Sequence, residues 1–184
     1  MNQHSQITRR SLLKTLGAAG AGVWALPHLV PSRALAGEGA KSKLNLALLG
    51  CGGRMGQILG SALDQGDNVV AICDVDARQI AVLKNKFSAP LERAKVYEDY
   101  RQLLDVEKSV DAVVIAPGQR WHVPMSKAAM LAGKHVFCEK PLAHSCAEAR
   151  EIRELGRQSQ LATQLGTQGG STDTFRRSME VIQA

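Results

Sequence analysis

Apolar runs of strand length alternate with segments of helical hydrophobic spacing over residues 44–184. Each strand-like run is apolar at successive positions, which predicts strands that are covered on both faces. Between these runs, apolar residues recur three and four positions apart, as on the buried side of a helix. The strand-like runs are residues 44–49, 68–73, 111–116, 135–140 and 161–166, with a shorter one beginning at Lys95.

Capping signals place several helices between these strands. Asp76 can cap a helix that continues toward Pro90, and the Ser145-x-x-Glu148 spacing of a capping box predicts a helix through about Gln158. Other helices are expected at residues 55–63, before Gly133, and near the C-terminus, where Phe175, Met179 and Ile182 share one face. The alternation predicts an α/β fold with a doubly wound parallel sheet, which binds ligands beyond the carboxyl ends of its strands.

The first 36 residues have a different character. The segment "TRRSLLK" (Thr8 to Lys14) places paired arginines before a Gly/Ala-rich apolar stretch that ends in Ala34-x-Ala36. This arrangement resembles a twin-arginine signal peptide, and predicts periplasmic location after export by the twin-arginine machinery. A membrane anchor is the alternative, but Pro27 and a histidine interrupt the apolar stretch. Residues 37–43 are then a polar leader, and residues 44–184 the folded domain.

Composition and charge narrow the class of protein. With 184 residues, 45% hydrophobic and 22% charged, the chain is a globular domain with a tail. The net charge of +6 falls to +2 without the four basic residues of the first 36, and aromatic residues are few, so we expect no nucleic-acid partner. No cysteine pair has zinc-site spacing. We therefore expect no metal, and buried free thiols at Cys51, Cys73, Cys138 and Cys146.

The stretch "GCGGRMG", residues 50–56, follows the first strand. In the G-x-G-x-x-G register the third glycine would fall at Met55, whereas Gly50-x-x-Gly53-x-x-Gly56 restores three glycines. In that register Gly56 lies in the first helical turn against the strand. Arg54 lies at the helix N-terminus, where backbone amides favour phosphate. We assign dinucleotide binding to Gly50, Gly52, Gly53, Arg54, Met55 and Gly56.

The second strand ends in an acid that fits this interpretation. Asp74 follows Gly50 by 24 residues, where the residue that binds the cofactor ribose is expected. A helix cap is the alternative role, but Asp76 is better placed for it. An acid at this position favours NAD, because it would repel the 2′-phosphate of NADP. Arg78 weakens this preference, so NADP stays open.

The stretch "KHVFCEKPL", residues 134–142, resembles the Glu-Lys-Pro signature of the Gfo/Idh/MocA oxidoreductases, a family of NAD(P)-dependent sugar and cyclitol dehydrogenases. The segments "CDVDARQ", "YEDYRQLL", "VDAVVIAPGQRWH" and "LATQLGTQGGS" agree with the family in order and spacing. Dihydrodipicolinate reductases share only the glycine turn. The resemblance covers residues 44–184 and implies an NAD(P)-binding Rossmann domain.

The resemblance also implies roles for individual residues. Glu139 and Pro141 would shape the nicotinamide pocket, and Gln164 matches a segment that touches cofactor and active site. Lys140 would reach the substrate, where a lysine can polarise a carbinol oxygen or relay its proton. For Lys140 alone, the alternative is a solvated surface residue.

The loop "APGQRWH" departs from the family pattern. Pro117 and Gly118 stand where Thr-Pro is usual, and Arg120 replaces the first histidine of a pair around a tryptophan. Trp121 and His122 match. We therefore assign Pro117 to cofactor binding and His122, with the lysine of the signature, to catalysis. The alternative for His122 is that it simply begins the next helix.

Family members continue into a second domain that holds the substrate and often forms the oligomer, which we expect to be absent from this chain. The favoured hypothesis is the NAD(P)-binding domain of an exported oxidoreductase that acts on a sugar or polyol by hydride transfer, truncated and inactive alone. The full-length form would be a homo-oligomer. One alternative is a stand-alone nucleotide-binding or regulatory module. Another is a fragment of an exported NAD-dependent glycosidase.

Overall fold

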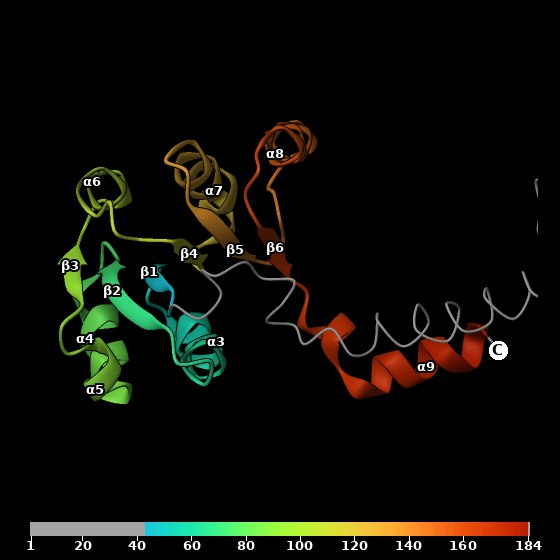
Figure 1. Cartoon of the computed structure of the whole chain (residues 1–184), viewed down its shortest axis with the longest axis horizontal. Coiled ribbons are helices and arrows are strands. Elements are labelled where there is room, and N and C mark those ends of the chain that lie inside the picture. Colours follow the sequence, from blue (N-terminus) through green and yellow to red (C-terminus); the bar gives the residue numbers. More distant parts are fainter. Residues whose placement is uncertain (1–42, 184) are drawn as a thin grey trace, which may run out of the picture. The chain divides into compact units, whose positions relative to one another are not determined.

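Residues 43–183, which the computed structural model describes, form a parallel six-stranded sheet with helices on both faces (Figure 1). The strand order is β3-β2-β1-β4-β5-β6, and every neighbouring pair is parallel. The strands are β1 Asn45–Leu49, β2 Asn68–Cys73, β3 Lys95–Tyr97, β4 Ala112–Ile115, β5 His135–Glu139 and β6 Thr163–Gly166. The predicted doubly wound sheet is confirmed. The predicted signal peptide, residues 1–36, and residues 37–42 of the leader lie outside the described residues.

Two layers of helices enclose the sheet. Figure 1 shows α6, α7 and α8 on one side, and α3, α4 and α5 on the other. Their bounds are α3 Gly53–Leu63, α4 Ala77–Lys86, α5 Ser88–Leu91, α6 Tyr100–Val106, α7 His122–Leu131 and α8 Cys146–Gln158, with α9 Asp173–Gln183 after the sheet. Two short 3-10 helices complete the set, η2 Gln119–Trp121 and η3 Gln168–Ser171. The crossovers run to opposite faces on either side of β1, which leaves a crevice where β1 and β4 end.

Local capping explains where two of these helices begin. The Asp76 side chain accepts a hydrogen bond from the backbone N–H of Arg78 and caps α4. Ser145 and Glu148 form the reciprocal capping box of α8. The single helix expected toward Pro90 is wrong, because Phe87 leaves the helical conformation and separates α4 from the short helix α5.

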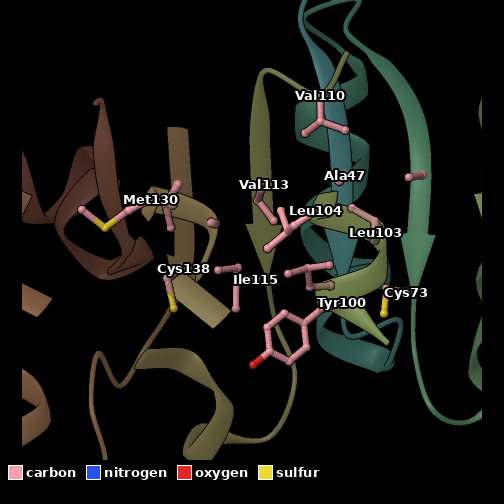
Figure 2. Close-up of a cluster of buried hydrophobic side chains, with 14 of the residues drawn as sticks. Ala47, Cys73, Tyr100, Leu103, Leu104, Val110, Val113, Ile115, Met130 and Cys138 are labelled. Atoms are coloured by element: carbon pink, nitrogen blue, oxygen red, sulfur yellow. The ribbon is translucent and has the colours of Figure 1, made fainter. Parts of the chain in front are cut away.

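Buried side chains fill both faces of the sheet. Figure 2 shows one cluster, in which Ala47, Val113 and Ile115 of the strands pack with Tyr100 and Leu103 of α6. On the other face, residues of β1 and β2 pack against α3 and α4; the cluster includes Leu48, Met55, Leu59, Ile72, Ile80 and Leu83. The expectation of strands covered on both faces is confirmed for the central strands, whereas the edge strands β3 and β6 keep exposed residues.

The four cysteines are free, as expected, but they are not all buried. Cys51, Cys73 and Cys138 lie in the core, whereas Cys146 is exposed as the first residue of α8. The expectation of burial is therefore wrong for Cys146. The reason is that this residue follows the N-cap of a helix whose first turn faces solvent, whereas the other three belong to strands or to the turn after β1.

The last helix, α9, leaves its apolar residues uncovered within residues 43–183. Phe175 is 49% exposed and Ile182 is 77% exposed, and no side chain described for α9 is fully buried. Among the residues that the structure describes, no helix combines the length and the apolar character that crossing a membrane requires.

Candidate functional site

A cavity of about 950 Å³ opens at the carboxyl ends of β1, β2 and β4. This volume is at the upper end of the range of small-molecule sites. The cavity is bounded by the turn after β1, the residues after β2 and β3, and the loop after β4. Its lining includes Gly50, Gly52, Asp74, Val75, Pro117 and Trp121.

The turn after β1 has the form of a phosphate cradle. Gly50 has a φ of +84°, and a Cβ there would lie 2.5 Å from the backbone nitrogen of Pro117. A Cβ on Gly52 or Gly53 would meet no atom within 4 Å, so this side of the turn is open. The helix α3 begins here without a side-chain cap, and the first N–H groups of a helix have no partner within it. The open turn and these donors fit the pyrophosphate of a dinucleotide.

Met55 and Gly56, in the first turn of α3, are both buried. Met55 is fully buried in the cluster with Leu83, so its side chain is not available to a ligand. Gly56 was expected to bring α3 close to the strand, and this is wrong. The atoms nearest to a Cβ on Gly56 belong to Leu83 and Lys86 of α4, at 3.7 Å or more. Gly56 faces α4 because Met55 and Leu59 are the residues of α3 that pack against the sheet.

Asp74 is held at the end of β2 beside the turn. One carboxylate oxygen accepts from the backbone N–H of Cys51 at 2.7 Å, and the other from the N–H of Asp76 at 2.9 Å. Asp76 performs the alternative role, that of the helix cap. The guanidinium of Arg78 pairs with Asp76 at 2.9 Å and hydrogen-bonds to it, which lowers the pKa of the Asp76 carboxyl. Of the two acids after β2, Asp74 therefore faces the cavity, and Arg78 is paired with Asp76.

Two thiols lie beside Asp74 but are not placed for chemistry. Burial, followed by the charge of Asp74, raises the pKa of both Cys51 and Cys73 to about 12. The thiolate is the reactive form of cysteine, so these thiols are inert at neutral pH. They contribute apolar volume under the turn.

His122 is the first residue of α7, and its ring is 2% exposed. Nδ1 lies 2.6 Å from the carbonyl oxygen of Pro141, and Nε2 lies 3.3 Å from that of Pro117. The imidazole thus bridges the ends of β4 and β5 and faces backbone rather than open cavity. This geometry is that of a side chain that holds the two loops in position.

The Glu-Lys-Pro segment follows β5 directly. The Glu139 side chain is buried and pairs with Arg54 at 2.7 Å, while its second oxygen accepts from the backbone N–H of Lys140 at 3.2 Å. The Lys140 side chain is exposed. The peptide bond between Lys140 and Pro141 is cis. The segment therefore presents an exposed lysine from a backbone that is tied through Glu139 to Arg54 of α3.

Gln164 does not join the other predicted residues. It lies in β6, is exposed, and lines a separate cavity of about 410 Å³ between α7, α8 and the last two strands. The other candidate residues all lie at the carboxyl ends of strands, in the turns that follow them, or in the first turn of the next helix. Gln164 is the second residue of a four-residue strand, which places it away from that edge.

The hydrophobic pattern of the sequence did not predict that two aromatic residues, Tyr100 and Trp121, would line the cavity together. Tyr100 and Trp121 meet edge to face with ring centroids 6.4 Å apart, and the Arg101 guanidinium lies over the Tyr100 ring at 4.6 Å. All three residues line the cavity. Their positions in the segments that follow β3 and β4 were a usable signal, because residues after parallel strands meet at one edge of the sheet.

Comparisons with known proteins agree with this fold. Residues 44–167 match the family described as "Oxidoreductase family, NAD-binding Rossmann fold" (Gfo/Idh/MocA). The inositol 2-dehydrogenase of Salmonella typhimurium is 37% identical over 89 residues, covering 48% of this chain and 25% of that protein. The alpha-N-acetylgalactosaminidase of Tannerella forsythia is 36% identical over 169 residues, covering 79% of this chain and 35% of that protein.

A solved structure has the same fold. The myo-inositol 2-dehydrogenase of Lactobacillus plantarum superimposes with a TM-score of 0.67 at 28% identity, covering 77% of this chain and 41% of that one. The chain thus spans between a quarter and about two fifths of the length of these relatives. The family match extends over most of the described residues and includes the turn, Asp74 and the Glu-Lys-Pro segment. The chain belongs to the Gfo/Idh/MocA family of oxidoreductases, as its NAD-binding Rossmann domain.

Proposed function

We propose that this domain binds NAD(H) across the ends of β1, β2 and β4 and serves hydride transfer to or from a sugar or polyol. The observation that carries the proposal is the open turn at Gly52 and Gly53, which lies at an uncapped helix N-terminus beside the anchored carboxylate of Asp74. The pyrophosphate would accept from the first amides of α3, and the adenosine ribose would donate to Asp74. We expect the site to bind NAD more tightly than NADP, because the Asp74 carboxylate would repel a 2′-phosphate and Arg78 is paired with Asp76.

The reaction assigns distinct tasks to the residues after β5. Bound NAD would supply the acceptor of the hydride. Lys140, which is exposed directly after β5, would polarise the carbinol oxygen and take up or pass on its proton. Glu139 and His122 hold the backbone on either side of this lysine. A polyol or sugar substrate is supported by the relatives that are inositol dehydrogenases.

Energy transfer from tryptophan to bound NADH tests the cofactor. Trp121 lines the cavity and is the only tryptophan of residues 43–183, and Trp24→Phe removes the other one. We expect NADH to quench this fluorescence saturably, and NADPH to do so at much higher concentration. Asp74→Asn should weaken NADH binding by about tenfold or more, since hydrogen bonds to charged groups contribute about 1.5–3 kcal/mol.

Asp105→Asn is the matched control, because the Asp105 side chain is 86% exposed on α6. It removes the same charge and should leave NADH binding unchanged. Absence of saturable quenching in the Trp24→Phe protein would contradict the proposal. Equal binding of NADH and NADPH would contradict the preference for NAD.

A second candidate function is favoured by one relative. The similarity to the alpha-N-acetylgalactosaminidase covers 79% of this chain and supports an NAD-dependent glycosidase, in which the cofactor is oxidised and reduced within one turnover. Such an enzyme cleaves a glycoside without net change of its nucleotide. Release of an aryl leaving group at constant absorbance of NADH would support it, and stoichiometric formation of NADH from a polyol would support the dehydrogenase.

The proposal includes export by the twin-arginine route, supported by the sequence of residues 8–36. This route carries folded proteins, which suits a domain that takes up its cofactor in the cytoplasm. Replacing both Arg9 and Arg10 by lysine should retain the protein inside the cell, measured by fractionation with an antibody. Recovery of this variant from the periplasm at the normal level would contradict the export proposal.

A further inference from the structure

An ion pair joins the phosphate turn to the end of β5. Arg54, the second residue of α3, extends its guanidinium to Glu139, and Nη2 lies 2.7 Å from Oε1. The Glu139 side chain is 4% exposed and the Arg54 side chain 31%. A buried carboxylate is costly without a paired charge, so Glu139 depends on this arginine.

Residues at and after the end of β6 complete the arrangement. A Cβ on Gly166 would lie 2.7 Å from Oε1 of Glu139, so glycine at this position leaves room for the carboxylate. In the amide orientation that satisfies both neighbours, Gln168 donates to the carbonyl oxygen of Gly166 at 2.8 Å and accepts from Nη2 of Arg54 at 3.0 Å. The network therefore connects α3, β5 and the segment after β6.

Both terminal nitrogens of the Arg54 guanidinium therefore have side-chain partners, whereas its buried Nε has none among the described residues. Its Nη2 contacts Glu139 and Gln168, and its Nη1 donates to the side chain of Gln57 at 3.0 Å. An arginine at a helix N-terminus would ordinarily serve as a phosphate ligand. Here the backbone amides of α3 would bind the phosphate. Arg54 instead pairs with Glu139, whose carboxylate accepts a hydrogen bond from the backbone N–H of Lys140.

We propose that Arg54 is a positioning residue for the nicotinamide end of the site and not a ligand of the pyrophosphate. The inference rests on the proposed function. Arg54 fixes Glu139, and Glu139 fixes the backbone at which Lys140 begins. Loss of the arginine would leave a buried carboxylate unpaired and displace the segment that forms the nicotinamide pocket. Contacts to the rest of the nucleotide would be unaffected.

Binding of NADH and of ADP-ribose distinguishes a positioning role of Arg54 from a role as a pyrophosphate ligand. ADP-ribose contains the pyrophosphate and both riboses of NADH and lacks only the nicotinamide. Calorimetric titration of the whole chain with each ligand should show that Arg54→Gln weakens NADH binding about tenfold. The affinity for ADP-ribose should change less than about twofold. The double variant Arg54→Gln/Glu139→Gln has no unpaired buried charge and should recover most of the NADH affinity.

Arg93→Gln is the charge-matched control. Arg93 is exposed just before β3, at the opposite end of the parallel sheet, and its replacement should change neither affinity. Equal losses for NADH and ADP-ribose in Arg54→Gln would show a phosphate ligand and overturn the inference. If Arg54→Gln does not fold, the double variant decides, since a loss of ADP-ribose binding in it also overturns the inference. Failure of the wild-type chain to bind either ligand would instead refute the proposed function.

Discussion

Replacing Gly50 by alanine tests how the turn after β1 is built. The φ of +84° is strained for any residue with a side chain, at a cost of about 1–2 kcal/mol. The new Cβ would also lie 2.5 Å from the nitrogen and 2.7 Å from the Cα of Pro117. These are backbone atoms at the end of the neighbouring strand and cannot rotate away, so the contact adds about 1–3 kcal/mol. We expect Gly50→Ala to lower the free energy of unfolding by about 2–5 kcal/mol.

Urea denaturation followed by circular dichroism measures this loss as a lower midpoint at unchanged slope. The melting temperature should fall by about 10 °C, given roughly 2–4 °C per kcal/mol for a domain of this size. Gly60→Ala is the matched control, because Gly60 lies within α3 and its Cβ would meet no atom within 4 Å. Alanine there should raise the stability by about 0.5–1 kcal/mol. A loss below about 1 kcal/mol at Gly50, or an equal loss at Gly60, would refute this reasoning.

Three further predictions concern other parts of the domain. Ellman's reagent at pH 8 should label one thiol of the folded protein, the exposed Cys146, and all four after unfolding in urea; labelling of a second thiol before unfolding would contradict the burial of the others. Hydrogen bonds from Lys95 and Tyr97 lower the pKa of Glu107, so its contribution to stability is present above the ordinary glutamate pKa of 4.5 and is lost as the pH falls below it. Glu107→Gln should therefore be less stable than wild type at pH 7 and converge with it in acid denaturation series, and a constant difference would refute the assignment. His122→Ala should lower the free energy of unfolding by about 2–4 kcal/mol, because it leaves a cavity and removes a hydrogen bond that ties the loops after β4 and β5, and a change within about 0.5 kcal/mol would exclude this bridging role.

The order of the elements was predictable because it depends on short-range patterns. The apolar run at residues 68–73 is β2, and the other strands begin or end within two residues of the predicted runs. The Ser145–Glu148 capping box and the Asp76 cap involve neighbours in the chain, so their residue types and spacing were sufficient. The break between α4 and α5 was not predictable, because it depends on the backbone conformation of Phe87.

The partners of the site residues were decided by the order of the strands. Gly50 meets Pro117 because β1 and β4 are neighbours, although 62 residues separate β1 from β4 in the chain. Gly56 faces α4 rather than the strand, and the ring of His122 turns toward backbone carbonyls rather than the cavity. No local pattern encodes these contacts.

Arg54 shows most clearly the difference between what the local sequence predicts and what the tertiary contacts decide. Its position at the start of a glycine-turn helix predicted a phosphate ligand, since a helix N-terminus attracts anions. In the structure its guanidinium pairs with Glu139, 85 positions away, and also donates to the side chain of Gln168. The sequence by itself determined the sheet, the turn and the family signature, because periodicity, glycine conformation and capping act over a few residues. Only the tertiary structure decided which charges meet, because a buried carboxylate is stabilised by whichever cation the folded chain brings beside it.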